Sequence, residues 1–218
     1  MKTALINGSP KERGSASGIL LEDLKAYLQD TEAVEYGFHT SAAAKEMAEA
    51  LNQADALVFA FPLYVDGIPG HLLSCLGDLE TAPCKNGGVR VYGIVNCGFY
   101  EGIQAEPALQ VLKNWCLKAG YVWGGGVGVG GGGALSQMPK TKSGHGPREP
   151  IEKALKVLAQ AICGGRAQGG RQDCCQAGEN LYVSVAFPRF LYKLAAQMGW
   201  RQMIKASGGR ARDLGRRP

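Results

Sequence analysis

The chain has 218 residues, 45% of them hydrophobic and 20% charged, a composition typical of one globular domain with embellishments. No apolar run is long enough to span a membrane, and the apolar segment at the N-terminus is too short for a signal peptide, so we expect a cytoplasmic protein. The net charge of +5 is equal to that of the segment from Trp200 onward, which contains six basic residues and one acidic residue, Asp213. We interpret this segment as a solvated tail and do not expect a nucleic-acid partner. The alternatives are contact with an anionic membrane surface or a phosphorylated cofactor, or a regulatory module that binds nucleic acid through this tail.

Apolar periodicity predicts strands that alternate with helices. The predicted strands are Thr3–Asn7, Ala33–Phe38, Asp55–Phe61, Val89–Asn96 and Tyr121–Val129. The predicted helices are Ser17–Gln29, Ser41–Gln53, Pro69–Leu79, Ala108–Ala119 and Pro150–Cys163. This alternation is typical of a parallel, doubly wound α/β sheet, whose ligands bind beside the carboxyl ends of the strands.

The rest of the chain is predicted to be an addition to this core. We expect one domain over residues 1–165 and a C-terminal extension over residues 166–218, with one helix at about 187–206 and the basic tail. The polar, glycine-rich segments 136–149 and 164–178 are expected to be loops.

Seven cysteines are scattered along the chain, and none forms a C-x-x-C pair. Reduced thiols, several of them buried, are the expected state in a cytosolic chain. The adjacent Cys174 and Cys175 form an alternative redox or metal pair, but no nearby histidine or second pair completes a tetrahedral site. The three histidines are too dispersed to suggest a metal site.

The first loop, N-G-S-P-K-E-R-G-S-A-S at Asn7–Ser17, joins a strand to a helix start. Serine hydroxyls and free amides at a helix N-terminus bind phosphate. The G-x-x-x-x-G-K-[ST] and G-x-G-x-x-G patterns are both absent, which favours a monophosphate. The alternative is a plain turn with a helix N-cap.

Two further loops follow predicted strands on the same edge. In F-P-L-Y-V-D-G-I-P-G at Phe61–Gly70, Tyr64 suits stacking on a flat ring, whereas Asp66 either contacts a ligand or caps the next helix. In V-N-C-G-F-Y-E-G at Val95–Gly102, amides and the Asn96 side chain suit a hydrogen-bonding ring edge. Cys97 has no histidine beside it to activate a nucleophile, so we interpret it as a small residue at a crowded strand end.

Together these loops describe a site for a flat ring that carries a monophosphate, and their motifs resemble those of the NADPH-dependent FMN reductases of the flavodoxin-like superfamily. The matching stretches are N-G-S-P-K with S-A-S, F-P-L-Y with G-I-P-G, and N-C-G-F-Y-E-G. The resemblance covers about residues 1–165. It implies a three-layer α/β/α sandwich with a five-stranded parallel sheet in the order 2-1-3-4-5, to which this chain adds its C-terminal helix.

The resemblance also implies the cofactor and its contacts. The FMN phosphate would be surrounded by Ser9, Lys11, Ser15, Ala16 and Ser17. The isoalloxazine ring would be lined by Pro62, Leu63, Tyr64 and Asp66, and its other edge by Asn96, Cys97, Gly98, Phe99 and Tyr100. An iron–sulfur centre is not expected, because the compact cysteine cluster of related iron–sulfur flavoproteins is missing.

We therefore expect an FMN-dependent oxidoreductase that passes electrons from NAD(P)H to quinone, nitro, azo, flavin or metal acceptors. Such enzymes are homodimers, and the cofactor carries the hydride chemistry, so we name no catalytic side chain. The alternative is a flavodoxin-like electron carrier without direct NAD(P)H activity, although flavodoxins are shorter and acidic. The run Gly124–Gly133, with eight glycines, suits either close backbone approach to the flavin or a partner, or a flexible strand end.

Overall fold

The computed structural model describes residues 1–81, 88–138, 146–164 and 178–210. The chain divides into two compact units, Met1–Val185 and Ala186–Pro218. Cys84, Cys174 and Cys175 of the sequence analysis lie outside the described residues, as do most of the expected loop at 164–178 and the end of the basic tail. The α/β core and the candidate site belong to the first unit.

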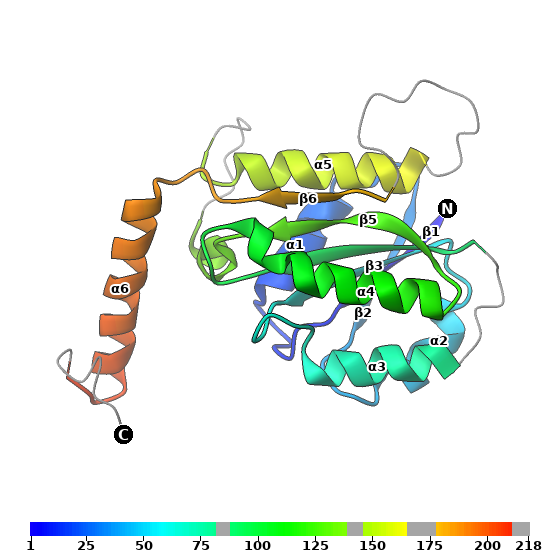
Figure 1. Ribbon diagram of the computed structural model, residues 1–218, viewed down its shortest axis with the longest axis horizontal. Coiled ribbons are helices and arrows are strands. Elements are labelled where there is room, and N and C mark those ends of the chain that lie inside the picture. Colours follow the sequence, from blue (N-terminus) through cyan, green and yellow to red (C-terminus); the bar gives the residue numbers. More distant parts are fainter. Residues whose placement is uncertain (82–87, 139–145, 165–177, 211–218) are drawn as a thin grey trace. The chain divides into compact units, whose positions relative to one another are not determined.

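The first unit is built on one parallel sheet with strand order β2-β1-β3-β4-β5-β6 (Figure 1). Its strands are β1 (Lys2–Asn7), β2 (Glu32–Gly37), β3 (Ala56–Pro62), β4 (Arg90–Asn96), β5 (Val122–Val129) and β6 (Asn180–Val183). The first five confirm the predicted strands and their order. Strand β3 is buried along its first six residues, as expected for a strand covered on both faces.

The sixth strand corrects the expectation of a five-stranded sheet. β6 pairs with β5 in parallel, from Gly126 with Asn180 to Val129 with Val183. Its four residues N-L-Y-V are only half-buried, so their apolar pattern is too short and too weak to identify a strand by itself. Pairing with the end of β5 supplies the hydrogen bonds that hold this segment as an edge strand.

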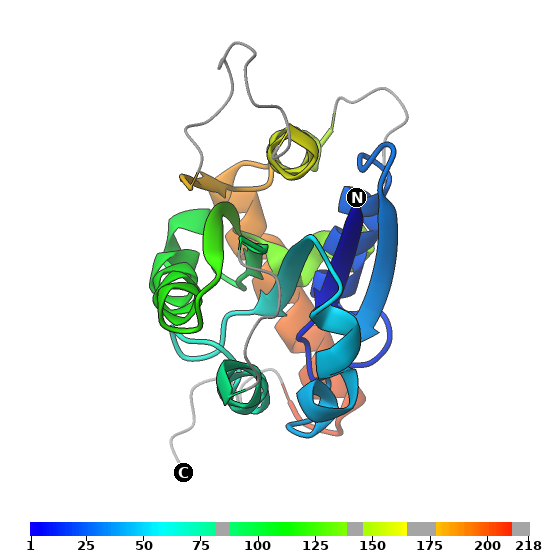
Figure 2. The same ribbon diagram turned by 90° about the vertical axis from the view of Figure 1, so that its right-hand side faces the viewer.

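Helices cover both faces of the sheet. They are α1 (Ala16–Lys25), α2 (Ala43–Leu51), α3 (Gly70–Thr81), α4 (Glu106–Lys118) and α5 (Glu149–Gly164), and two 3-10 turns, η1 (Gly102–Ala105) and η2 (Gly132–Gln137), follow β4 and β5. Helices α1 and α5 contact each other, while α2, α3 and α4 form the second layer. Figures 1 and 2 show α5 and α3 on opposite sides of the strands. This arrangement is the predicted three-layer sandwich.

Two features hold the helices to one another and to the sheet. On α4, the buried Trp115 donates its indole N–H to the carbonyl of Leu76 on α3 over 2.8 Å. Its ring packs edge-on against Phe59 of β3, with ring centroids 5.7 Å apart. Between α1 and α5, the buried Arg148 forms an ion pair with Asp23. Burial lowers the pKa of Arg148, so the pair depends on close contact with its carboxylate.

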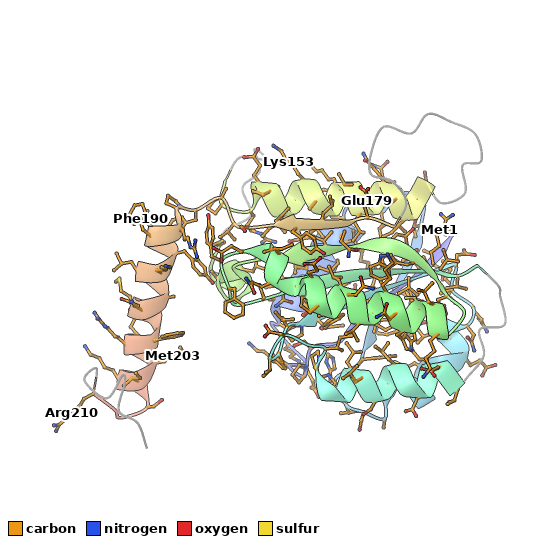
Figure 3. All side chains as sticks on the ribbon, in the orientation of Figure 1. Met1, Lys153, Glu179, Phe190, Met203 and Arg210 are labelled. Atoms are coloured by element: carbon orange, nitrogen blue, oxygen red, sulfur yellow. The ribbon has the colours of Figure 1, made fainter. Side chains whose placement is uncertain are left out.

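The second unit contains helix α6 (Arg189–Ala206), the predicted C-terminal helix. Its large exposed apolar side chains include Phe190 and Met203, both labelled in Figure 3. Among the described residues, no helix combines the length and the apolar character that crossing a membrane requires.

Candidate functional site

The candidate site lies at the carboxyl edge of the sheet, where the strand order reverses. Strand β1 lies between β2 and β3, so the chain leaves β1 toward one side and later continues on the other. Such a switch point is where open α/β sheets bind ligands. The three loops of the sequence analysis follow β1, β3 and β4, which are neighbours in the sheet.

Helix α1 begins at the first loop with a side-chain cap. Ser15 has an extended backbone, and its Oγ accepts from the amide of Gly18 over 3.0 Å. The first amides of a helix lack intrahelical acceptors, and no described residue accepts a hydrogen bond from the amides of Ala16 and Ser17. The plain-turn alternative is therefore correct about the cap, and two free amides remain beside it.

The hydroxyl protons of this loop differ in availability. Ser9 Oγ accepts from the amide of Lys11 over 3.2 Å, and no described group accepts the Ser9 or Ser15 hydroxyl proton. Ser17 instead donates its hydroxyl to Asn96 Oδ1 over 2.8 Å. Lys11 Nζ lies 3.3 Å from the carbonyl of Gly14. The loop thus holds two serine hydroxyls, two amides and an ammonium group that suit an anion.

Two residues that shape this loop were missed by the sequence analysis. Asn7 donates through Nδ2 to Ser15 Oγ over 3.3 Å and accepts through Oδ1 from the Ser9 amide over 3.1 Å. An Asn before a Gly-Ser turn is a signal for such side-chain to backbone bonds. His39 donates through Nδ1 to the Ser9 carbonyl over 2.6 Å. It follows β2, so only the pairing of β2 with β1 brings it to the loop.

The second loop forms a tight turn with a strained tip. Tyr64 and Gly67 exchange two backbone hydrogen bonds of 3.1 and 3.0 Å, and Val65 and Asp66 between them have φ of 48° and 58°. A β-branched residue at positive φ is a strained conformation. Val65 is 100% exposed and Tyr64 is 50% exposed. Pro62 and Leu63, which lead into the turn, are half-buried.

The third loop combines buried and exposed residues. Cys97 is buried, and burial raises the pKa of its thiol, which does not suit a nucleophile. Its amide donates to the Val129 carbonyl over 2.9 Å, and its own carbonyl accepts from Gly132 over 2.8 Å. Cys97 therefore packs the strand end. Phe99 is 55% exposed, and Gly98 and Tyr100 flank it.

The backbone of the glycine run packs closely against the backbone of this third loop. A Cβ at Gly130 would lie 2.0 Å from the carbonyl oxygen of Tyr100, and one at Gly128 would lie 2.6 Å from that of Gly102. Gly125 has a φ of +123° and lies at a register shift between β4 and β5. Much of the run forms the regular strand β5. Its glycines allow the chain's own backbone to approach closely.

A cavity of about 180 Å³ lies at the opposite edge of the sheet, lined by Met1, Asp55, Ala56, Gly88, Arg90, Tyr92 and Ile162. Most of these residues precede or begin β1, β3 and β4. The cavity is thus separate from the carboxyl edge and from the three loops of the candidate site.

No protein-family model and no curated protein matches this chain, but solved structures do. The Trp repressor binding protein of Bacillus subtilis matches with a TM-score of 0.53 and 17% identity, over 73% of this chain and 99% of that one. A flavodoxin from Streptococcus pneumoniae TIGR4 matches with a TM-score of 0.54 and 12% identity, over 76% and 99%. An FMN-dependent NADH-azoreductase from Bacillus anthracis, in complex with FMN, matches with a TM-score of 0.52 and 15% identity, over 74% and 97%. At these identities the likeness is one of fold, and it confirms that this chain has the flavodoxin-like fold that its loop motifs predict.

Proposed function

We propose that the three loops bind FMN, with the phosphate in the first loop and the ring between the second and third. The observation that carries the proposal is the donor set at the start of α1, where the amides of Ala16 and Ser17 and the hydroxyl protons of Ser9 and Ser15 lack acceptors among the described residues. The exposed Tyr64 and Phe99 follow the neighbouring strands β3 and β4. This donor set suits a monophosphate, and aromatic rims suit a flat ring.

The proposed contacts divide by chemistry. Lys11 adds a positive charge to the phosphate end. Ring contacts are assigned to the two exposed aromatic residues and to the backbone around them, which includes Pro62, Leu63, Asp66, Gly98 and Tyr100. When bound, FMN supplies hydride acceptance from a nicotinamide and electron donation to an acceptor. The chain itself binds the phosphate at the first loop and holds the ring between the second and third loops.

We propose on this basis an oxidoreductase that takes electrons from NAD(P)H and passes them to a small-molecule acceptor. The likeness of fold to an FMN-dependent NADH-azoreductase supports the proposal. We further propose that the chain forms a homodimer. The exposed apolar side chains of Tyr64 and Phe99 at the site support it, and sedimentation of the full chain tests it.

The phosphate end is tested by comparing FMN with riboflavin, which lacks the phosphate. We expect wild-type protein to bind FMN more tightly, as measured by quenching of flavin fluorescence. Ser15→Ala should weaken FMN binding by about tenfold, because a charge-assisted hydrogen bond is lost, and should leave riboflavin binding unchanged. The control Ser74→Ala changes an exposed serine on α3 whose hydroxyl donates to the carbonyl of Gly70, and it should alter neither affinity. Equal affinities of wild-type protein for both flavins would contradict a phosphate site.

The reaction is tested by mixing flavin-loaded protein with NADH or NADPH without oxygen and following flavin absorbance. Fast bleaching by either nucleotide supports the oxidoreductase, and a panel of quinone, nitro and azo compounds then identifies the acceptor class. A flavin-loaded protein that neither nucleotide reduces would instead support an electron carrier. Protein that binds no flavin would rule out both functions.

A further inference from the structure

We propose that Asn96 is a positioning residue that ties the first loop to the other two loops, so that binding at the phosphate end depends on a residue of the ring end. The inference rests on the proposed FMN site. It departs from the sequence analysis, in which the Asn96 side chain was expected at the ring edge, and it gives the Ser17 hydroxyl a role other than phosphate binding.

The tie consists of one buried hydrogen bond between distant parts of the chain. Ser17 Oγ donates to Asn96 Oδ1 over 2.8 Å. Ser17 is 1% exposed and Asn96 is 7% exposed. A buried hydroxyl or amide left without its partner costs more free energy than an exposed one. Ser17 lies in the first turn of α1 and carries one of the two free amides, so the bond sets the position of that turn relative to β4.

The backbone of Asn96 joins the second loop as well. Its carbonyl oxygen accepts from the amide of Leu63 over 2.8 Å, and Asn96 pairs with Pro62 at the last position of the β3–β4 register. One residue therefore bonds through its side chain to the first loop and through its main chain to the second.

The turn η2, which follows β5, lies against the same side chain. A Cβ at Gly132 would lie 3.0 Å from Asn96 Cβ and 3.1 Å from Asn96 Nδ2. The amide of Gly132 also donates to the carbonyl of Cys97 over 2.8 Å. The backbone at Gly132 thus leaves little space on that side of Asn96, and a confined side chain positions its partner more effectively than a mobile one.

The positioning role predicts a distinctive pattern of flavin affinities. Asn96→Ala should raise the Kd for FMN by about fivefold, the loss expected for one intramolecular hydrogen bond, and should change the Kd for riboflavin by less than about twofold. Ser17→Ala should do the same, and the double variant should be no weaker than either single variant. The ³¹P resonance of bound FMN should shift in Asn96→Ala, although Asn96 lies outside the phosphate loop.

Two results would overturn the proposal. Equal loss of FMN and riboflavin affinity in Asn96→Ala would make Asn96 a direct ring ligand. Additive effects of Ser17→Ala and Asn96→Ala would make the two residues independent. The control pair Ser74→Ala and Asn114→Ala changes exposed residues of α3 and α4 that share no hydrogen bond, and it should leave both affinities unchanged.

A double-mutant cycle measured by urea unfolding, without flavin, tests the hydrogen bond between Ser17 and Asn96. The effect of the double variant on the unfolding equilibrium constant should differ by about fivefold from the product of the two single-variant effects. For the control pair the two values should agree. Additive effects for Ser17 and Asn96 would show that the two side chains do not stabilise the fold through their hydrogen bond. If wild-type protein binds no flavin, the proposed function fails on that measurement, while the tie is judged by the unfolding cycle.

Discussion

Val65 shows how a single residue carries strain at the rim of the candidate site. Its φ of 48° and full exposure place a β-branched side chain in the left-handed region with no packing in return. We expect Val65→Asn to raise the free energy of unfolding by about 1 kcal/mol, because asparagine tolerates this conformation. Urea unfolding measures the change. Val111→Asn, at an exposed position within α4, should give no such gain, and a loss of stability in Val65→Asn would contradict the strain.

Cys116 shows how burial makes stability depend on pH. Burial raises the pKa of its thiol from an ordinary value of 9.0 to about 12. Below pH 9 both folded and unfolded chains keep the proton. Between these two pKa values only the unfolded chain releases it, so the thiol lowers the free energy of unfolding by up to about 1.4 kcal/mol per pH unit.

Cys116→Ala removes this titration and provides the comparison. We expect the difference in unfolding free energy between wild type and variant to shrink as pH rises from about 9, because only wild type loses the contribution of the thiol proton. Urea unfolding under reducing conditions measures it. Parallel pH profiles for the two proteins would show that the Cys116 thiol has an ordinary pKa in the folded state.

At the scale of elements, Gly130, which directly follows strand β5, allows the chain to pack closely against the loop after β4. Gly130→Ala should lower the free energy of unfolding by about 3 kcal/mol, since its Cβ would lie 2.0 Å from the backbone oxygen of Tyr100. The matched change Gly133→Ala meets no atom within 4 Å and should have an effect within about 0.5 kcal/mol. Thermal or urea unfolding distinguishes them. Equal stability of the two variants would mean that the loop after β4 moves freely away from β5.

At the scale of the whole molecule, the core lies in the unit Met1–Val185. Every buried residue of its main apolar cluster lies between Ala4 and Trp123. A chain ending at Val185 should therefore keep its unfolding midpoint in urea, measured by circular dichroism. A chain ending at Glu179 also loses β6, whose Val183 carbonyl accepts from Gly130 over 2.8 Å, and should be less stable by about 2 kcal/mol or more. If the chain that ends at Val185 failed to fold, α6 would be shown to contribute to the stability of the core.

The sequence alone predicts much of this protein because its signals are local. The apolar run before Phe61 and the leucines of α1 indicate element type without knowledge of neighbours. Loops with serine, glycine and aromatic residues at three strand ends indicate a common edge, since parallel strands end together. From these signals follow the fold, the first five strands and the three loops.

The remaining features depend on tertiary structure, because they join residues far apart in the chain. His39 reaches the first loop only through the pairing of β2 with β1, and β6 is a strand only because β5 offers it hydrogen bonds. Ser17 and Asn96 both look like ligand residues in the sequence, and only their 2.8 Å contact makes them a tie. Local patterns determine which elements form, whereas the use of each polar group depends on the partner that folding brings beside it.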